Sequence, residues 1–316
     1  MRMLFFALTA LLCAVRPASA DETFRLAVGQ RGLWDTAVAE LGQRGGIFRE
    51  HGLALDILYT QGAAETQQAV ISGSVDIGVS PGAPGVFGAF AKGAPLRIIG
   101  SEIIGGGDLF WYVRAESPIR ALRDIGERTI AYSTNGAASH SIVMTFISEH
   151  GLKARPVATG GPPATLTQVM SGQIDVGWAG PPFGLDLVDQ GRIRIIATGN
   201  DAGALKNQTG RVIIANAAVL QSRQPAVARF MQAYRETIDW MYAEGDSAAF
   251  RHYADFMGIG EPAMRRARDA FYPKAVLDPD VILGIDAINA EAVRLRYMAA
   301  PLTREQLAEL IRIPPK

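Results

Sequence analysis

Cysteine is nearly absent from the sequence, and histidine is scarce. The single cysteine, Cys13, lies within the first 20 residues, so the chain beyond that point can form no disulfide and offers no thiol nucleophile. The four histidines (His51, His140, His150 and His252) lack the short spacings typical of metal ligands. No set of nucleophile, base and orienting residue is recognisable. We therefore expect a protein with no metal, no cofactor and no catalytic residues.

The sequence also has no excess of positive or negative charge. The 316 residues include 31 basic and 31 acidic ones, and no basic tract appears. This argues against nucleic acid and anionic membranes as partners. The composition, with 48% hydrophobic and 20% charged residues, is that of an ordinary globular protein, and the length allows two domains.

No apolar run is long enough to span a bilayer, which takes about 20 residues. Residues 1–3 are a short basic start, residues 4–15 are apolar, and Ala18-Ser19-Ala20 is a small-residue cleavage site. A lipid anchor on Cys13 is disfavoured because Leu12 before it is bulky. The pattern predicts a signal peptide over residues 1–20, cleaved after Ala20, and a soluble periplasmic protein. Cleavage would remove two basic residues and no acidic one, leaving a formal charge of −2.

Two segments 99 residues apart repeat one pattern. Residues 72–78 (SGSVDIG) recur as residues 171–177 (SGQIDVG), so that Asp76 corresponds to Asp175. Two copies of one α/β unit suggest two similar lobes with a cleft between them. We interpret the two aspartates as groups that bond backbone at helix or turn ends, not as catalytic acids.

Each copy leads into a turn of small residues at the end of a short apolar strand. Ser80 and Gly82 follow the first copy, and Gly180 and Pro181 follow the second. In an open α/β sheet, ligands bind outside the carboxyl ends of the strands, so these residues are candidate ligand contacts. The alternative is that they form only tight turns.

Two further segments are candidates for the same cleft. Arg31 and Trp34 follow the opening strand, where a cation could bind an anion and an indole could cover an apolar ligand. The alternatives are a solvated arginine and a core tryptophan. Residues 133–139 (STNGAAS) open a helix. They offer the side chains of Thr134 and Asn135, serine hydroxyls and free backbone N–H groups, a composition suited to binding an anion. Helix capping alone is the alternative interpretation. Trp178 and Phe183 are additional aromatic candidates.

The chain passes between the lobes at two places. Gly105-Gly106-Gly107 precedes a strand at 109–113 and marks the first crossover, and the strand at 211–214 returns to the first lobe. We expect a first lobe of residues 21–104 plus 215–316, a second lobe of residues 105–214, and hinges near 103–110 and 207–215. Helical periodicity dominates from residue 217 onward, including residues 281–295.

Five local features together resemble the periplasmic substrate-binding proteins of ATP-binding-cassette (ABC) importers of the nitrate/sulfonate/taurine type. They are Gly29-Gln30; GIF at 46–48 with HGL at 51–53; residues 72–78 with KGAPL at 92–96; SPI at 117–119 with DI at 124–125; and SG at 171–172 with DV at 175–176. The resemblance covers nearly the whole chain after residue 20. It implies a type II periplasmic-binding fold, in which each lobe is a mixed sheet flanked by helices and the C-terminal segment is helical.

The resemblance also implies where the ligand lies. It places ligand contacts near the following residues: Gln30, Arg31, Trp34, Ser80, Gly82, Thr134, Asn135, Ala137, Gly180 and Pro181. Members often have Gly-Ser-Ser or Gly-Ser-Thr at the helix-opening loop, where this chain has Ser133-Thr134-Asn135-Gly136, so taurine or nitrate is not assumed.

We therefore expect a monomeric binding protein that delivers a small organic anion, an aromatic or alkyl carboxylate or sulfonate, to the permease of an ABC importer. One alternative is an enzyme of the same fold that makes a thiamine pyrimidine precursor, which would need a reactive histidine and a lysine in the cleft; only His140 lies near the expected site. The other alternative is a periplasmic sensor or a receptor for another class of transporter.

Overall fold

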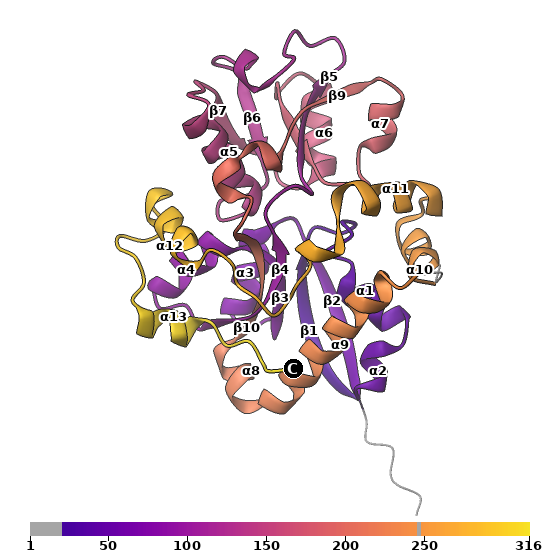
Figure 1. The fold of residues 1–316 in the computed structure, drawn as a ribbon, viewed down its shortest axis with the longest axis vertical. Helices are drawn as coiled ribbons and strands as arrows, with labels where there is room; N and C mark the ends of the chain where they lie inside the picture. Colours follow the sequence, from indigo (N-terminus) through magenta and orange to yellow (C-terminus); the bar gives the residue numbers. More distant parts are fainter. Residues whose placement is uncertain (1–20, 245–247) are drawn as a thin grey trace, which may run out of the picture.

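The structure is a computed structural model that describes residues 21–244 and 248–316. Two lobes lie one above the other in Figure 1. The predicted signal peptide falls outside the described residues. We call the lower lobe, which holds the first strands of the chain, the first lobe, and the upper one the second lobe.

The first lobe is built on a five-stranded sheet of order β2-β1-β3-β10-β4. Its strands are β1 (Glu22–Gly29), β2 (Leu53–Thr60), β3 (Ile77–Gly82), β4 (Leu96–Ile104) and β10 (Thr209–Asn216). β1 runs parallel to β2 and β3, whereas β10 runs antiparallel to β3 and β4. The returning strand β10 therefore lies in the first sheet along its whole length.

The second lobe repeats this arrangement. Its strands are β5 (Phe110–Arg114), β6 (Thr129–Tyr132), β7 (Arg155–Ala158), β8 (Gly177–Ala179) and β9 (Ile193–Thr198). They form a β8-β5-β9 sheet and a parallel β6-β7 pair, and a bridge between Ile130 and Val176 places β6 beside β8. The combined order β7-β6-β8-β5-β9 matches that of the first lobe, with β5 in the place of β10.

Helices cover both sheets. The first lobe carries α1 (Val38–Arg44), α2 (Ile47–Glu50), α3 (Ala63–Ile71), α4 (Ala83–Ala91), α8 (Ala217–Ser222), α9 (Gln224–Met241), α10 (Ala248–Met257), α11 (Glu261–Phe271), α12 (Ile285–Arg294) and α13 (Arg304–Leu310). The second carries α5 (Ala138–Glu149), α6 (Pro162–Met170) and α7 (Leu185–Asp189). Short 3₁₀ turns are η1 (Leu122–Asp124), η2 (Gly199–Asp201), η3 (Gly203–Leu205) and η4 (Lys274–Val276).

The helical periodicity predicted for the C-terminal part is confirmed for α9. It is wrong for residues 281–284, which precede α12 and are not helical. Val227, Phe230 and Ile238 of α9 are buried in the core of the first lobe, as their spacing of three or four residues predicts. The periodic stretch at 281–295 begins its helix only at Ile285, because Gly284 ahead of it takes a left-handed conformation. Val281 lies exposed in the preceding loop.

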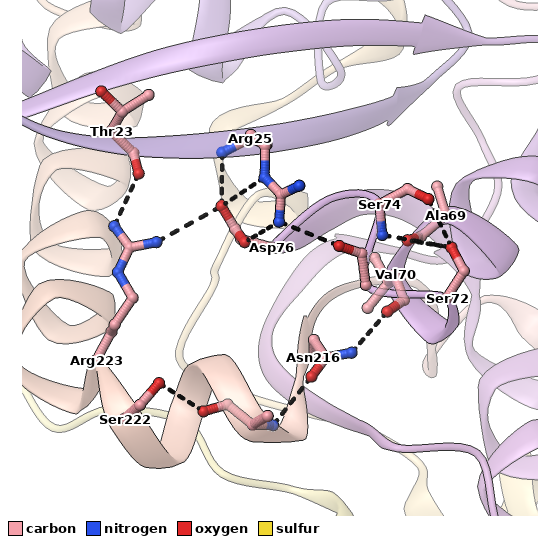
Figure 2. Close-up of polar contacts among 12 residues, drawn as sticks. Thr23, Arg25, Ala69, Val70, Ser72, Ser74, Asp76, Asn216, Ser222 and Arg223 are labelled. Atoms are coloured by element: carbon pink, nitrogen blue, oxygen red, sulfur yellow. Dashed lines mark hydrogen bonds and ion pairs between the residues drawn. The ribbon is translucent and has the colours of Figure 1, made fainter.

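The repeated aspartates do the same structural work in both lobes. The Asp76 carboxylate accepts a hydrogen bond from the backbone N–H of Arg25 in β1 at 2.9 Å, and Asp175 accepts one from Thr129 in β6 at 2.9 Å. Figure 2 shows Asp76 held in addition by the side chains of Arg25 and Arg223. Burial raises the pKa of Asp76, but the hydrogen bonds from Arg25 outweigh it and leave the pKa lowered. The interpretation of these aspartates as backbone-bonding groups is confirmed.

Candidate functional site

A small cavity lies between the lobes. Its lining comes from both of them: Gln30, Leu33, Ala63, Ser80 and Arg211 of the first lobe, and Leu109, Ser133, Ala137, Ala138, Ser139 and Trp178 of the crossover and second lobe. The space open to the centre of a water molecule is about 20 Å³. That volume suffices for about one water molecule, so a larger ligand requires the lobes to move apart.

Strained backbone is concentrated at this cavity. Among the non-glycine residues in the described chain, only Gln30, Ser80 and Arg296 have a positive φ, at 68°, 82° and 60°. Gln30 and Ser80 both line the cavity. A left-handed conformation is unfavourable for side chains with a Cβ and is retained where the surroundings impose it, often at binding sites.

Three polar atoms on residues that line the cavity have no hydrogen-bond partner among the described residues. They are Nε1 of Trp178, Oε1 of Gln30 and Nε of Arg211. Trp178 is only 2% exposed, so its indole N–H is a buried donor without an acceptor, which is costly unless a ligand or water supplies one. The sequence suggested Trp178 only as an apolar surface, whereas the structure adds a polar role.

The helix-opening loop borders the cavity on the second lobe. Helix α5 begins at Ala138, and no side chain caps it at Ala137, which argues against capping as the role of this polar loop. Instead the Ser139 hydroxyl accepts a hydrogen bond from the backbone N–H of Ser133, and Gln30 Nε2 donates to the Ser133 hydroxyl at 3.0 Å. The positive end of the α5 dipole therefore faces the cavity.

Several other predicted residues lie at contacts between the lobes. The Thr134 hydroxyl accepts a hydrogen bond from the backbone N–H of Ala64 at 3.3 Å, and Asn135 lines a neighbouring pocket at the edge of the cleft. Gly82 packs on the second lobe so closely that a Cβ there would lie 2.2 Å from the Gly136 carbonyl oxygen. Closure thus depends on small residues at this contact.

The turn that follows β8 also meets the first lobe. Gly180 packs against Leu33 and Leu109, where a Cβ would lie 2.7 Å from Leu33 Cδ2. The Pro181 carbonyl accepts a hydrogen bond from the Tyr272 hydroxyl at 2.8 Å. These two predicted residues therefore support the lining of the cavity and do not line it themselves.

Arg31 and Trp34 do not line the cavity either. The Arg31 guanidinium lies 4.5 Å from the centre of the Phe256 ring and donates to the Phe256 carbonyl. Trp34 is 1% exposed, stacks on Phe250 and donates its indole N–H to the Tyr242 hydroxyl at 3.0 Å. The structure thus places Trp34 in the core, in line with the alternative interpretation of the sequence.

A buried group of charges lies beneath the cavity, and no local pattern in the sequence indicates it. Arg211 of β10 donates to Asp35 and Asp108, each at 2.6 Å, and its Nε lies 3.6 Å from a Glu102 oxygen. We call these four residues the Arg211 cluster. The place of Asp35 ahead of a helical segment predicts a helix cap, but α1 begins three residues later, and the Asp35 carboxylate accepts a hydrogen bond from Arg211 instead.

Burial shifts Glu102 and Asp108 of the Arg211 cluster toward their neutral forms. It raises the pKa of Glu102 well above its usual value, and the neighbouring Asp35 carboxylate raises it further. Burial also raises the pKa of Asp108 to about 6, although Arg211 opposes the shift. One guanidinium thus faces three carboxyl groups that cannot all remain ionised.

Comparison with known proteins identifies relatives of this fold. The sequence model described as NMT1/THI5 like matches residues 37–248. No curated protein sequence matches the chain. In the part of the chain that the structure describes, no helix is both long and apolar enough to cross a membrane, and no group of His, Cys, Asp and Glu there is arranged to hold a metal ion.

Several solved structures share the architecture. The alkanesulfonate-binding protein SsuA from Xanthomonas axonopodis pv. citri, bound to MOPS, has a TM-score of 0.76 at 19% identity and covers 95% of this chain and 100% of its own. The periplasmic aliphatic sulphonate-binding protein SsuA from Escherichia coli has a TM-score of 0.68 at 20% identity, with 93% of each chain covered. The periplasmic nitrate-binding protein NrtA from Synechocystis PCC 6803 has a TM-score of 0.70 at 14% identity and covers 92% of this chain and 86% of its own. The predicted periplasmic-binding fold is confirmed.

Proposed function

We propose, from the premise that the chain belongs to the NMT1/THI5-like family, that it is an extracytoplasmic solute-binding protein. It captures a small organic anion between its lobes and delivers it to the permease of an ABC importer. The observation that carries this proposal is the cavity between the lobes, where the unpaired Trp178 N–H and the uncapped N-terminus of α5 both offer donors. Donors that converge in a buried cavity suit a carboxylate or sulfonate.

The apolar part of the lining favours an alkyl or aromatic body on the ligand. Leu33, Leu109 and the ring of Trp178 contribute this surface. A ligand of that size enters when the lobes rotate about the two crossovers, near 103–110 and 207–215, and is enclosed when they close again. We propose the expected division into a first lobe of residues 21–104 plus 215–316 and a second of residues 105–214, except that residues 209–214 belong to the first lobe, because β10 lies in its sheet.

The periplasm is the proposed location. The pattern over residues 1–20 supports export, and two of the structural relatives are described as periplasmic. The amino terminus of the exported protein, read by mass spectrometry, tests cleavage after Ala20, and a lipid on Cys13 would contradict it. We propose a monomer, which light scattering checks.

A catalytic role is not proposed. An enzyme that forms a pyrimidine precursor on this fold would need a reactive histidine and a lysine in the cleft. His140 bonds the Tyr297 hydroxyl and does not line the cavity, and none of the residues that do line it in the described chain is a lysine. Burial lowers the pKa of His140 to about 4, so it is neutral at physiological pH.

A thermal-shift screen of the exported chain tests the binding function. The panel comprises nitrate, alkyl sulfonates, aliphatic and aromatic carboxylates, pyrimidines and neutral amino acids. A ligand at about 100 times its dissociation constant adds about 2.7 kcal/mol to the free energy of unfolding, a shift of several degrees. We expect a shift with an organic anion that Trp178→Phe reduces. A shift with neutral heterocycles alone would contradict the anion assignment.

Two further experiments test the finer claims. Arg31→Ala shows whether Arg31 contacts the ligand despite its distance from the cavity lining: an unchanged affinity would remove it from the site. Uptake of the bound anion by vesicles carrying the cognate permease and ATPase tests delivery. If the purified protein binds the anion but does not stimulate its uptake, a sensor role would replace transport.

A further inference from the structure

The Arg211 cluster contains more carboxylate oxygens than donors. Within residues 21–244 and 248–316, no hydrogen-bond donor reaches Asp35 Oδ1, Asp108 Oδ1 or either oxygen of Glu102. All three carboxyl groups are fully buried, and Arg211 is the one cation that faces them in the described chain. With every acid ionised the cluster would carry a formal charge of −2 away from water, which is strongly unfavourable.

A bound proton reduces both the negative charge and the number of missing donors. Glu102 and Asp35 approach the same guanidinium: a Glu102 oxygen lies 3.6 Å from Arg211 Nε, and Asp35 Oδ2 lies 2.6 Å from a terminal nitrogen of Arg211. Two ionised carboxylates would repel there, because each can only accept a hydrogen bond. A protonated carboxyl becomes a donor, so one proton on Glu102 supplies one of the missing donors and removes one negative charge.

The groups around the cluster supply no alternative charge. Three phenols approach it from the C-terminal helices: Tyr234 of α9, Tyr253 of α10 and Tyr272 after α11. Burial raises the pKa of each, and the carboxylates raise it further, so all three stay neutral. The Tyr253 and Tyr272 hydroxyls already donate to backbone carbonyls. The balance of charge therefore rests on the four residues of the cluster.

We propose that the Arg211 cluster is a proton-binding site beneath the ligand cleft: Glu102, both of whose oxygens lack a donor among the described residues, keeps a proton at neutral pH, and Asp108, whose Oδ1 also lacks one there, takes up a second proton on acidification. Arg211 also lines the cavity, so each proton taken up below it makes the floor of the cleft less negative. The proton site itself is independent of the proposed function. Its effect on a bound anion rests on that function.

The position of the cluster explains why its charge reaches the cleft. Asp108 lies in the first crossover, just after the three glycines, and Arg211 lies on the returning strand β10. Asp35 follows the strand end at Gln30 that borders the cavity. The cluster therefore joins both crossovers to the wall of the binding cavity, where a change in charge acts over a few ångströms in a medium that screens poorly.

Infrared spectroscopy of the exported protein tests the proton directly, because a protonated carboxyl group has a carbonyl stretch that ionised carboxylates lack. At neutral pD we expect this band in the wild type and its loss in Glu102→Gln. Between pD 7 and 5 a further component should appear, and Asp108→Asn should lack it. Asp76→Asn is the matched control: Asp76 is a buried carboxylate whose pKa is lowered, so the band should not change.

The infrared band can support or overturn the proton site. Absence of a protonated carboxyl band in the wild type at neutral pD would overturn the proposal, as would a band that survives in Glu102→Gln. The wild-type spectrum and Asp108→Asn remain informative if Glu102→Gln does not fold. Because no ligand is added, failure here leaves the proposed binding function standing, and failure to bind any anion leaves the proton site standing.

Discussion

The backbone N–H of Gly136 in the second lobe donates a hydrogen bond to the Tyr297 hydroxyl, 2.8 Å away in the segment after α12. His140 Nδ1 bonds the same hydroxyl. Tyr297 belongs to the C-terminal part of the first lobe, and Arg296 before it has a left-handed conformation. The lobes are thus joined directly at the loop that opens α5, so Tyr297 stabilises the closed arrangement.

Replacing this hydroxyl should favour the open arrangement. We expect Tyr297→Phe to weaken ligand binding about fivefold to tenfold, the effect of losing roughly 1 kcal/mol of hydrogen bonding. Calorimetry measures the affinity, and small-angle scattering the mean separation of the lobes. The control is Tyr59→Phe, which removes a hydroxyl that donates to Glu40 within the first lobe. An equal loss in both variants would show a general effect of removing a phenol.

Gly82 offers a steric test of closure. Its φ of −68° is open to any residue, but a Cβ would lie 2.2 Å from the carbonyl oxygen of Gly136 in the other lobe. We expect Gly82→Ala to reduce affinity more than tenfold while the unfolding midpoint without ligand stays the same or rises slightly, because alanine restricts the unfolded chain. Binding and thermal denaturation measured together separate these effects.

The matched control for that experiment is Gly161→Ala. Gly161 also has an ordinary φ, −72°, but the nearest atom to an added Cβ is 3.7 Å away. This substitution should leave affinity unchanged. A folded Gly82→Ala variant that binds as tightly as the wild type would mean that the ligand does not require this contact between the lobes.

The two buried tryptophans of the second lobe have different hydrogen-bond status. Trp178 Nε1 has no partner among the described residues, whereas Trp111 Nε1 donates to the Ala131 carbonyl at 2.9 Å. Trp178→Phe should therefore weaken anion binding by roughly 1.5–3 kcal/mol, the contribution of a hydrogen bond to a charged group, through loss of a ligand donor. Trp111→Phe should instead lower the stability without a specific effect on binding. The reverse pattern would remove Trp178 from the site.

The sequence predicted well those features that depend on neighbouring residues. The short pattern around Asp76 and around Asp175 is read from neighbouring residues, and each aspartate accepts a hydrogen bond from strand backbone as expected. The internal repeat extended this success to the two-lobed architecture, because equivalent residues must fold in equivalent ways.

The binding cavity was less predictable because it combines distant segments. Arg211 and Asp35 are 176 residues apart, and their contact exists only because β10 returns beside β3 and β4. Trp34 followed a strand end, as a ligand contact should, yet the aromatic side chains of α10 cover it. Periodicity does not reveal which helices will cover a given side chain, so burial at such a position depends on the tertiary fold.

Stability should respond to pH through two opposing groups. The pKa of Asp108 is raised from 3.8 to about 6, so its contribution is present at low pH and is lost as pH rises through about 6. The pKa of His140 is lowered from 6.5 to about 4, so its contribution is present above 6.5 and is lost as pH falls toward 4. In Asp108→Asn only the His140 contribution remains. The free energy of unfolding, measured with urea, should therefore fall more steeply than in the wild type as the pH is lowered from 6.5 to 4.5. Parallel curves for the two proteins would contradict the raised pKa of Asp108.

The affinity for an anion should depend on pH through Asp108. A negative ligand next to Arg211 disfavours the ionised form of Asp108, so binding raises the pKa of this group and takes up protons. Affinity for an anion should therefore be higher at pH 5.5 than at pH 7.5, by roughly sixfold if the two charges interact by about 1.4 kcal/mol. Calorimetry at both values measures this ratio, and in Asp108→Asn it should approach one. Proton release on binding, or an unchanged ratio in Asp108→Asn, would place the ligand charge away from Arg211 and toward the N-terminus of α5.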